Sequence, residues 1–459
     1  MMTKRGKSTG SSSQRLKELN RISELPDPLI CQILSHLSTK EAVSTSVLST
    51  RWRSLWLCVP ALELGHWNLS DFSAFVSFCD RFFDSSRVSC IHRVKLNIAE
   101  NEDEANPSHL KSWINAAVKR KIQRLNVLCP PESSYVMPGS LYKCETLVSL
   151  KLQYLEVNFV GVEFVSLPCL KTLHLKYVRY NRNDANFERL VSCCPVLEEL
   201  EVLECDWLRA IVYRVVSRSL KKLTVHIHED EPESEFRSGF VVDAPRLRFL
   251  SINDNLSDSF VIKNMDSDSK VDLSLPFGLI VFDEASVSSR RSSVGGFLSG
   301  ISKVRDMTIC KDTFKLICKY SRLEPLPQFG HLSHLRVTLY VSQMKWLPTF
   351  LERCPNLKSL VLVWDGNSER MCEDDWLNPR IRFSSVPECL LSSLEFVEFK
   401  TSITGHAPEI TLVSYFLENS TILKKLTLRL DYYYANEKDF FTVLRVIPKR
   451  SITCQVVVL

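Results

Sequence analysis

Six-residue segments with apolar residues at positions one, four and six recur through the middle of this 459-residue chain. The bare pattern is common by chance in an apolar chain. However, in seven of the eight clearest segments the second residue is charged, and the first five segments start 23, 27, 23 and 27 residues apart. The eight begin at residues 147, 170, 197, 220, 247, 357, 394 and 423. A unit of this size cannot bury its apolar face alone, whereas stacked units can. The repetition therefore predicts a solenoid.

Each unit is expected to contain one short strand. In the segment that begins at residue 170, a period of two places Leu173 and Leu175 on the inward face and His174 and Lys176 on the outward face. Upstream stretches such as "FERLVSCCP" and "PTFLERCP" are typical of short helices that end at the proline. The spacing fits leucine-rich repeats. Weaker matches at 91, 122, 304 and 332 extend the array, and Gly, Ser and charge near 283–300 predict an irregular surface loop.

The sixteen cysteines are spread along the chain without a C-x-x-C pair, which argues against zinc ribbons and thioredoxin-type redox sites. Cys144, Cys194 and Cys354 each precede a repeat segment by three places. Because a free cysteine packs as a small hydrophobe, these three are expected to form part of an internal ladder. No metal and no cofactor is expected.

The net charge of +5 is concentrated at the N-terminus. Residues 1–21 contain six basic residues and one acidic residue, so the remaining residues are neutral in sum. With no clustered basic charge in the body, a nucleic acid is not an expected partner. No apolar run is long enough for a membrane span or a secretory signal. The sequence therefore predicts a disordered basic tail over residues 1–20 and an intracellular protein, in the nucleus or cytoplasm, without a membrane partner.

The stretch "LPDPLICQILSHL", residues 25–37, predicts an amphipathic helix with Asp27 as its cap and Pro28 in its first turn. Ser38 and Glu41 have capping-box spacing for a second helix, and Ser49 is placed to cap a third. Three short helices in 36 residues are too small for an independent core, which usually needs about 40 residues. The segment therefore needs a partner surface, either the repeat body or another protein.

No catalytic motif was found. The chain contains no G-x-S-x-G, Walker A, H-E-x-x-H or G-x-G-x-x-G pattern. The pairs His226 with His228 and His331 with His334 have spacings at which both histidines could ligate one metal ion. Histidines in such pairs more often lie on a solvated strand edge. Asp374 and Asp375 are interpreted as surface residues. The chain is therefore expected not to be an enzyme.

Residues 21–56, "RISELPDPLICQILSHLSTKEAVSTSVLSTRWRSLW", closely resemble an F-box. The stretches "VPECLLSSLEFVEFK" and "LVSYFLENSTILKKLTLRL" resemble the FBD module of plant F-box/leucine-rich-repeat proteins. The resemblance implies an α/β chain: a three-helix F-box (21–60), a leucine-rich-repeat solenoid (85–385), and an FBD module (386–459) that continues the array. The solenoid is expected to be a curved sheet of short parallel strands with helices on its convex side.

The resemblance also implies a function. F-box proteins of this kind are substrate-recognition subunits of Skp-cullin-F-box ubiquitin ligases, in which the F-box docks on a Skp-type adaptor and through it on cullin and a RING protein. Carried onto this chain, the docking residues are Leu25, Pro26, Leu29, Ile30, Ile33, Leu34, Leu37, Val43, Leu48, Trp52, Leu55 and Trp56. Some of these side chains must form the core of the module itself, and the sequence does not separate the two groups.

Target binding is assigned to the outward face of the predicted strands. The candidates there are Lys151, His174, Lys176, Glu199, Glu201, Lys222, Arg336, Val361 and Val363. One alternative to a ligase receptor is an interaction scaffold whose F-box packs on its own repeats. Another is an enzyme whose active site lies on the repeats, but no residue spacing in the sequence indicates such a site.

Overall fold

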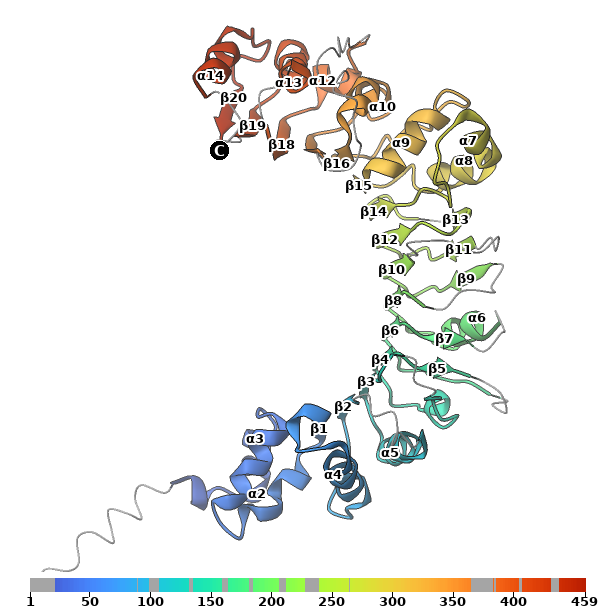
Figure 1. Ribbon diagram of the computed structural model, residues 1–459, viewed down its shortest axis with the longest axis vertical. Helices are drawn as coiled ribbons and strands as arrows, with labels where there is room; N and C mark the ends of the chain where they lie inside the picture. Colours follow the sequence, from blue (N-terminus) through green and yellow to red (C-terminus); the bar gives the residue numbers. More distant parts are fainter. Residues whose placement is uncertain are drawn as a thin grey trace, which may run out of the picture. The chain divides into compact units, whose positions relative to one another are not determined.

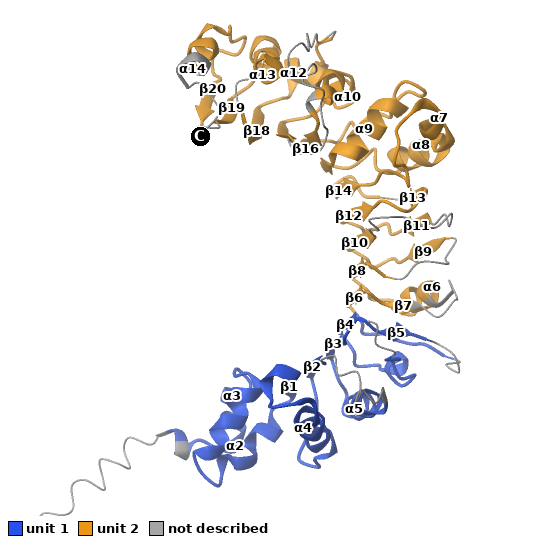
Figure 2. Cartoon of the chain, in the orientation of Figure 1, with its two compact units in different colours: residues 1–170 blue, residues 171–459 orange. Residues whose placement is uncertain are grey.

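The protein is described here by a computed structural model, which divides into two compact units, residues 1–170 and 171–459 (Figure 2). The described residues are 21–88, 90–98, 107–131, 135–158, 164–180, 185–205, 212–227, 239–263, 265–364, 383, 385–403, 407–430 and 437–459. The predicted basic tail, His228, Asp374 and Asp375 lie outside them. No helix among the described residues is long and apolar enough to cross a membrane.

The first unit begins with a bundle of short helices, as the sequence predicts. They are η1 (Arg21–Glu24), α2 (Asp27–Leu34), α3 (Thr39–Ser44), η2 (Thr45–Val47) and η3 (Trp52–Cys58). Two predicted caps were wrong. The N-cap of α2 is Pro26, with Asp27 inside the first turn, and the N-cap of η3 is Arg51, whereas Ser49 contributes only its carbonyl to the Trp52 N–H. The side chain of Asp27 instead forms an ion pair with Arg51 at 2.6 Å.

The capping box of α3 is present as predicted. The backbone N–H and the hydroxyl of Ser38 donate to Glu41 Oε2 at 2.9 and 2.8 Å, and the Glu41 N–H donates to Ser38 Oγ at 3.3 Å. These bonds, first that from the backbone and then that from the hydroxyl, hold the pKa of Glu41 below its usual value. The box satisfies N–H groups that a helix start otherwise leaves open.

The rest of the first unit alternates strands and helices. Its elements are β1 (Ala61–Gly65), η4 (His66–Asn68), α4 (Phe72–Asp84), β2 (Arg93–Asn97), α5 (Pro107–Lys119), β3 (Arg124–Leu128), η5 (Leu141–Lys143), β4 (Ser149–Gln153) and β5 (Glu156–Val157). Strands β1 to β4 pair in parallel in sequence order. The Thr39 hydroxyl accepts a bond from the Glu63 N–H at 2.8 Å, so the helical module is fixed directly to the first strand.

The second unit is a longer parallel ladder in the order β6-β8-β10-β12-β14-β15-β16-β17-β18-β19-β20 (Figure 1). These strands are Thr172–Lys176, Glu199–Leu203, Lys222–Ile227, Phe249–Asp254, Lys270–Ser274, Asp306–Ile309, His334–Leu339, Ser359–Trp364, Phe396–Ile403, Lys425–Leu430 and Gln455–Val458. A short strand β7 (Arg179–Tyr180) follows β6. A smaller parallel sheet contains β9 (Tyr213–Val216), β11 (Gly239–Asp243) and β13 (Ser259–Lys263).

Helices cover one side of this ladder (Figure 1). They are α6 (Ala185–Ser192), α7 (Glu284–Ser289), α8 (Arg291–Gly300), α9 (Lys311–Tyr320), η6 (Val341–Trp346), α10 (Leu347–Leu351), α12 (Glu388–Ser392), α13 (Ala407–Asn419) and α14 (Glu437–Val446). The expected α/β class, with short parallel strands and helices on one side, is confirmed.

Successive strands pair in register, which aligns their inward residues into continuous apolar rows. Leu223 on β10 pairs with Leu200 on β8 and with Leu250 on β12, and all three are fully buried. Full burial of one such side chain contributes about 1.5–3 kcal/mol. The rows supply the core that no single repeat has alone.

The three cysteines that precede repeat segments are buried, as predicted. Cys144, Cys194 and Cys354 are free and buried, and Cys194 Sγ lies 3.1 Å from the Leu190 carbonyl oxygen. Burial raises the pKa of the Cys194 thiol to about 12 and that of Cys354 well above its usual value. The Cys194 and Cys354 thiols therefore stay protonated and serve as packing groups.

The predicted irregular loop at 283–300 was wrong, because this stretch forms helices α7 and α8. Asp283 caps α7 by accepting a bond from the Ser286 N–H at 2.7 Å. Val294 and Phe297 are buried on α8. A Cβ on Gly295 would lie 2.6 Å from the Tyr320 hydroxyl, so the glycine allows close helix packing where the sequence pattern indicated a turn.

The row of inward leucines is expected to carry the stability of the second unit. Leu223→Ala should lower the free energy of unfolding by about 2–5 kcal/mol, because it leaves a cavity between two neighbouring repeats. Its outward neighbour gives the matched control: Thr224→Ala should change stability by no more than about 0.5 kcal/mol. Urea denaturation followed by circular dichroism measures both. Equal losses for the two variants would contradict the assignment of the core.

Candidate functional site

The structure divides the twelve residues of the predicted docking surface into a core group and an exposed group. Four are buried in the core of the helical module: Ile30, Leu34, Trp52 and Leu55. Leu25, Val43 and Trp56 are partly buried. The exposed members are Pro26, Leu29, Ile33, Leu37 and Leu48. The wide apolar stripe seen in the sequence is thus two faces of one helix, of which only one is available for contact.

Helix geometry explains the division on α2. Ile30 and Leu34 are four residues apart and point into the module, where neither is exposed. Leu29 and Ile33, also four apart, lie on the other side and are 46% and 43% exposed, and Leu37, just beyond the helix end, is 39% exposed. Large apolar side chains at this spacing on one open helix face are typical of a helix that docks in a partner's groove.

A second exposed group lies at the end of η2. Val47 is 86% exposed and Leu48 is 64% exposed. Sequence reasoning included Leu48 but missed Val47. A helical wheel drawn through residues 40–48 could not find it, because the helix changes there from α to 3-10 geometry and ends at Val47. Leu29, Ile33, Leu37, Val47 and Leu48 are called the exposed apolar set below.

Trp56 has a structural task. Its ring stacks on Phe78 of α4 with a centroid separation of 5.3 Å and lies 6.2 Å from the Phe82 ring. Trp52 is buried among the helices of the module. The two tryptophans that the sequence offered as docking anchors therefore hold the module together and fix it to the following helix. The exposed apolar set is aliphatic throughout.

The predicted target-binding residues lie on the strand positions that face away from the helices. Lys151 is exposed on β4 of the first unit. In the second unit Arg336 on β16 pairs in register with Val361 on β17, and Val363 lies two places further along β17. The Lys176 ammonium lies over the Tyr177 ring at 5.3 Å from its centroid. The structure therefore does not bring the nine candidates together at one point.

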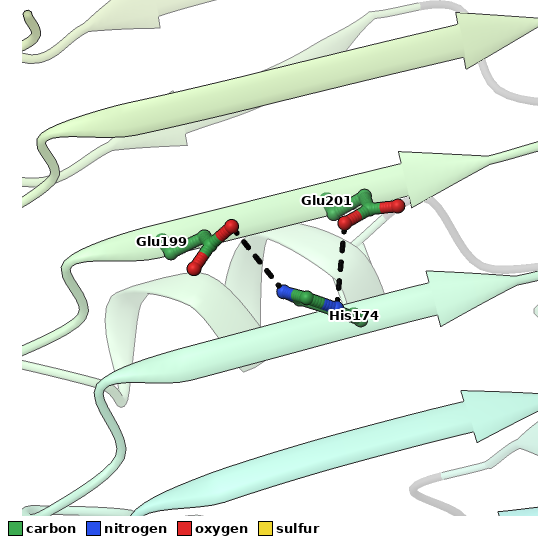
Figure 3. A group of neighbouring side chains, drawn as sticks. All are labelled: His174, Glu199 and Glu201. Carbon is green, nitrogen blue, oxygen red and sulfur yellow. Dashed lines mark ion pairs between the residues drawn. The ribbon is translucent and has the colours of Figure 1, made fainter. Parts of the chain in front are cut away.

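Four of these candidates form one charged cluster on β6, β8 and β10. His174 lies between two carboxylates, with Nε2 at 3.6 Å from Glu199 Oε1 and Nδ1 at 3.3 Å from Glu201 Oε2 (Figure 3). The Lys222 ammonium lies 2.8 Å from Glu199 Oε1. Register explains the meeting, since His174 pairs with Glu201, and Glu199 pairs with Lys222. Aligning successive repeats position by position predicts such neighbours from the sequence.

His174, Glu199 and Glu201 have ligand atoms within 4.8 Å of one another, so they could hold a metal ion. Each ring nitrogen faces one carboxylate, and Lys222 adds a cation to the same group. The Lys222 ammonium offsets part of the negative charge of the two carboxylates, and we interpret the cluster as an ion-pair network. Its mixed charge and half-buried position suit recognition of a polar partner.

His226 and His334, one member of each metal pair considered from the sequence, contact other side chains, and His228 lies outside the described residues. His226 Nε2 lies 2.7 Å from Asn253 Nδ2 and 3.4 Å from a Glu204 carboxylate oxygen. His334 Nδ1 lies 2.8 Å from Asp306 Oδ1. Within the described residues, neither histidine belongs to a group of three metal-ligating side chains.

Three family models match this chain. An F-box domain matches residues 22–60, the LRR repeats of FBD-associated F-box protein At5g56370 match residues 110–268, and an FBD matches residues 382–428. The Arabidopsis thaliana "Putative FBD-associated F-box protein At5g53635" is 57% identical over 95% of this chain and 99% of its own length. The "Putative F-box/FBD/LRR-repeat protein At2g05300" of the same plant is 51% identical over 97% of this chain and 98% of its own length.

The division into core and exposed residues predicts opposite effects on stability. Trp56→Ala should lower the free energy of unfolding by about 2–4 kcal/mol, because it removes a large ring packed on Phe78. Leu48→Ala, which truncates an exposed side chain, should stay within about 0.5 kcal/mol of the unchanged chain. Thermal and urea unfolding followed by circular dichroism compare them. A destabilising Leu48→Ala with a neutral Trp56→Ala would reverse the assignment.

Proposed function

This chain belongs to the F-box/FBD/LRR-repeat proteins of plants, and we propose that it is a substrate-recognition subunit of a Skp-cullin-F-box ubiquitin ligase. In this role the F-box docks on a Skp-type adaptor, which links the chain to cullin and a RING protein. The repeats bind a target protein for ubiquitination. The chain itself makes and breaks no bonds, and it works in the nucleus or cytoplasm, where such ligases act.

The observation that carries the proposal is the exposed apolar set. The buried core of the module is made by Ile30, Leu34, Ala42, Trp52, Leu55 and Val59. The five large aliphatic side chains of the exposed apolar set lie outside this core and are exposed. Exposing them to water costs free energy that a partner surface recovers, at about 25 cal/mol for each Å² of apolar surface buried. Specific interfaces have such an apolar centre with a polar rim.

The surroundings of the set suit a rigid docking element. The Ser38–Glu41 capping box fixes the start of α3, and the Arg51–Asp27 ion pair links η3 to α2. The Arg51 guanidinium also donates to the Leu25 carbonyl at 2.5 Å. Because these contacts hold the helices in place before binding, little conformational entropy is lost when a partner docks.

One observation supports the alternative, an interaction scaffold whose F-box packs on its own repeats. The module does pack on the segment that follows it, through Trp56 on α4 and through Thr39 on β1. These contacts use the core side of the module. Leu37 borders this junction, where it lines a small pocket with Thr39 and Glu63. Because the other four residues of the exposed apolar set are not part of these contacts, the ligase receptor explains more of the surface.

Substitutions in the exposed apolar set are expected to abolish adaptor binding without unfolding the chain. Leu29→Asp and Leu48→Asp each place a charge where the adaptor must bury an apolar group, so each should weaken binding by a factor of about 30 or more. Co-purification with a co-expressed plant Skp-type adaptor, followed by titration calorimetry, measures the loss.

Ile452→Asp is the matched control, because Ile452 is fully exposed in the second unit and is not part of the set. This variant should bind as the unchanged chain does, and all three should have the same circular dichroism spectrum. An unchanged chain that binds no Skp-type adaptor of the plant would sink the proposal. If the chain is an interaction scaffold and not a ligase receptor, Leu29→Asp should leave its binding to other partner proteins unchanged.

Substitutions on the strand face should separate target binding from adaptor binding. Arg336→Glu combined with Val361→Lys reverses one charge and adds another at two paired strand positions. We expect this variant to retain the adaptor and to lose proteins that proximity labelling detects around the unchanged chain under proteasome inhibition. A labelling pattern that stays the same would place target recognition elsewhere on the repeats.

A further inference from the structure

Helix α9 carries a row of basic residues on one face. Lys311, Lys315 and Lys319 are spaced by four, and Arg322 follows three places later, beyond the helix end. Residues spaced by three and four lie on the same side of a helix. Lys345, from η6, completes the group. These five residues are called the α9 basic face.

Aromatic rings lie under these cations. The charged groups of Lys319, Arg322 and Lys345 lie 5.8, 5.3 and 5.4 Å from the centroid of the Trp346 ring. The Lys311 ammonium lies 5.0 Å from the Tyr340 centroid. Lys315 lies 5.8 Å from the same ring and 5.6 Å from that of Phe282. A ring face attracts a cation, so the rings hold the charged groups in place.

The local charge stands out from the rest of the chain. Residues 311–322 contain four basic residues and Asp312, which gives 4 − 1 = +3, and Lys345 raises the sum to +4. The residues after the N-terminal 21 are neutral in total. This concentration of positive charge is not evident in the sequence, because buried residues such as Phe314 and Ile317 stand between the lysines.

Three of these cations gather at one ring. The charged groups of Lys319, Arg322 and Lys345 all lie against Trp346, so they repel one another while the ring attracts each of them. A carboxylate that approaches this cluster is attracted by all three cations at once.

We propose that the α9 basic face binds an acidic segment of a partner protein, one rich in Asp and Glu with interspersed apolar residues. The carboxylates of such a segment pair with the cations around Trp346, which are Lys319, Arg322 and Lys345, and relieve their mutual repulsion. Its apolar residues have a nearby contact surface in Ile280 and Val281, which are 80% and 60% exposed and directly precede Phe282. The binding surface belongs to the second unit, whereas the F-box belongs to the first, and the proposal does not depend on the ligase assignment.

The surroundings favour a protein over a nucleic acid. Phosphate backbones are recognised by long basic tracks, and binding there grows with the number of charges placed along the track. Here the cations are few, held on aromatic rings, and next to exposed aliphatic side chains. Aromatic residues and Arg beside apolar groups are characteristic of protein interfaces.

The test uses the full chain and a fluorescein-labelled 16-residue peptide of alternating Glu and Asp with four Leu residues. Fluorescence anisotropy should detect binding that weakens as NaCl is raised, because exposed charge pairs are screened. The same peptide with Gln and Asn in place of the acids should not bind. Combined Lys319→Glu, Arg322→Glu and Lys345→Glu should weaken binding about tenfold or more.

Two controls isolate the face. Combined Lys171→Glu, Lys221→Glu and Lys424→Glu makes the same charge change at exposed lysines elsewhere in the second unit and should leave affinity within about twofold. Lys4→Gln, Arg5→Gln and Lys7→Gln tests the basic tail and should also leave binding intact. Circular dichroism confirms that each variant is folded, and Arg322→Gln with Lys345→Gln offers a milder change if the triple reversal unfolds the chain.

Three results would overturn the proposal: no binding of the acidic peptide, an equal loss in the α9 triple variant and the control triple, or tighter binding of a 20-base-pair DNA duplex through the same residues. The last result would assign the face to nucleic acid. A loss confined to the α9 variant, with weaker binding of the duplex, supports an acidic protein partner.

Discussion

The in-register stacking of inward leucines is the constraint on which the rest of the structure depends. A strand of four to eight residues buries too little surface to be stable alone. A parallel sheet is stable only where other elements cover its apolar side chains, and in a repeat protein the neighbouring repeats supply that cover. Because Leu200, Leu223 and Leu250 pair directly, each repeat provides the packing surface for the next. The same register places the residues between them in rows on the opposite face, which is how His174 meets Glu201.

This constraint also explains what the sequence could and could not predict. The strands and the buried cysteines were predictable, because their positions recur in each repeat and the same positions must pack in the core of every repeat. Helices α7 and α8 were not, since Gly295 and the serines around it suggest a turn until Tyr320 is known to pack against the glycine. Asp27 was expected to cap a helix, but its carboxylate forms an ion pair with Arg51 instead.

The site showed the same limit. The residues of the F-box were recognisable in the sequence, but which of them are buried and which exposed was not. Leu29 and Ile30 are adjacent and equally apolar, yet Leu29 is exposed and Ile30 is buried. Only the placement of α3 and η3 decides which side of α2 is covered. The α9 basic face escaped for a related reason: its cations are scattered in sequence and gather only through helical spacing and the approach of Trp346 from η6. The chain thus presents three kinds of surface: an aliphatic one on the F-box, a mixed polar one along the strands and a basic one on α9.

We propose that the exposed apolar set, and not the core of the module, contacts a Skp-type adaptor. Hydrogen exchange of the full chain with and without the adaptor tests it most directly. Amides of residues 29–37 and 45–49 should exchange more slowly when the adaptor is bound, while those of β8, β10 and β12 should be unchanged. Stable association that leaves residues 29–37 unaffected, or slowed exchange confined to the repeats, would contradict it.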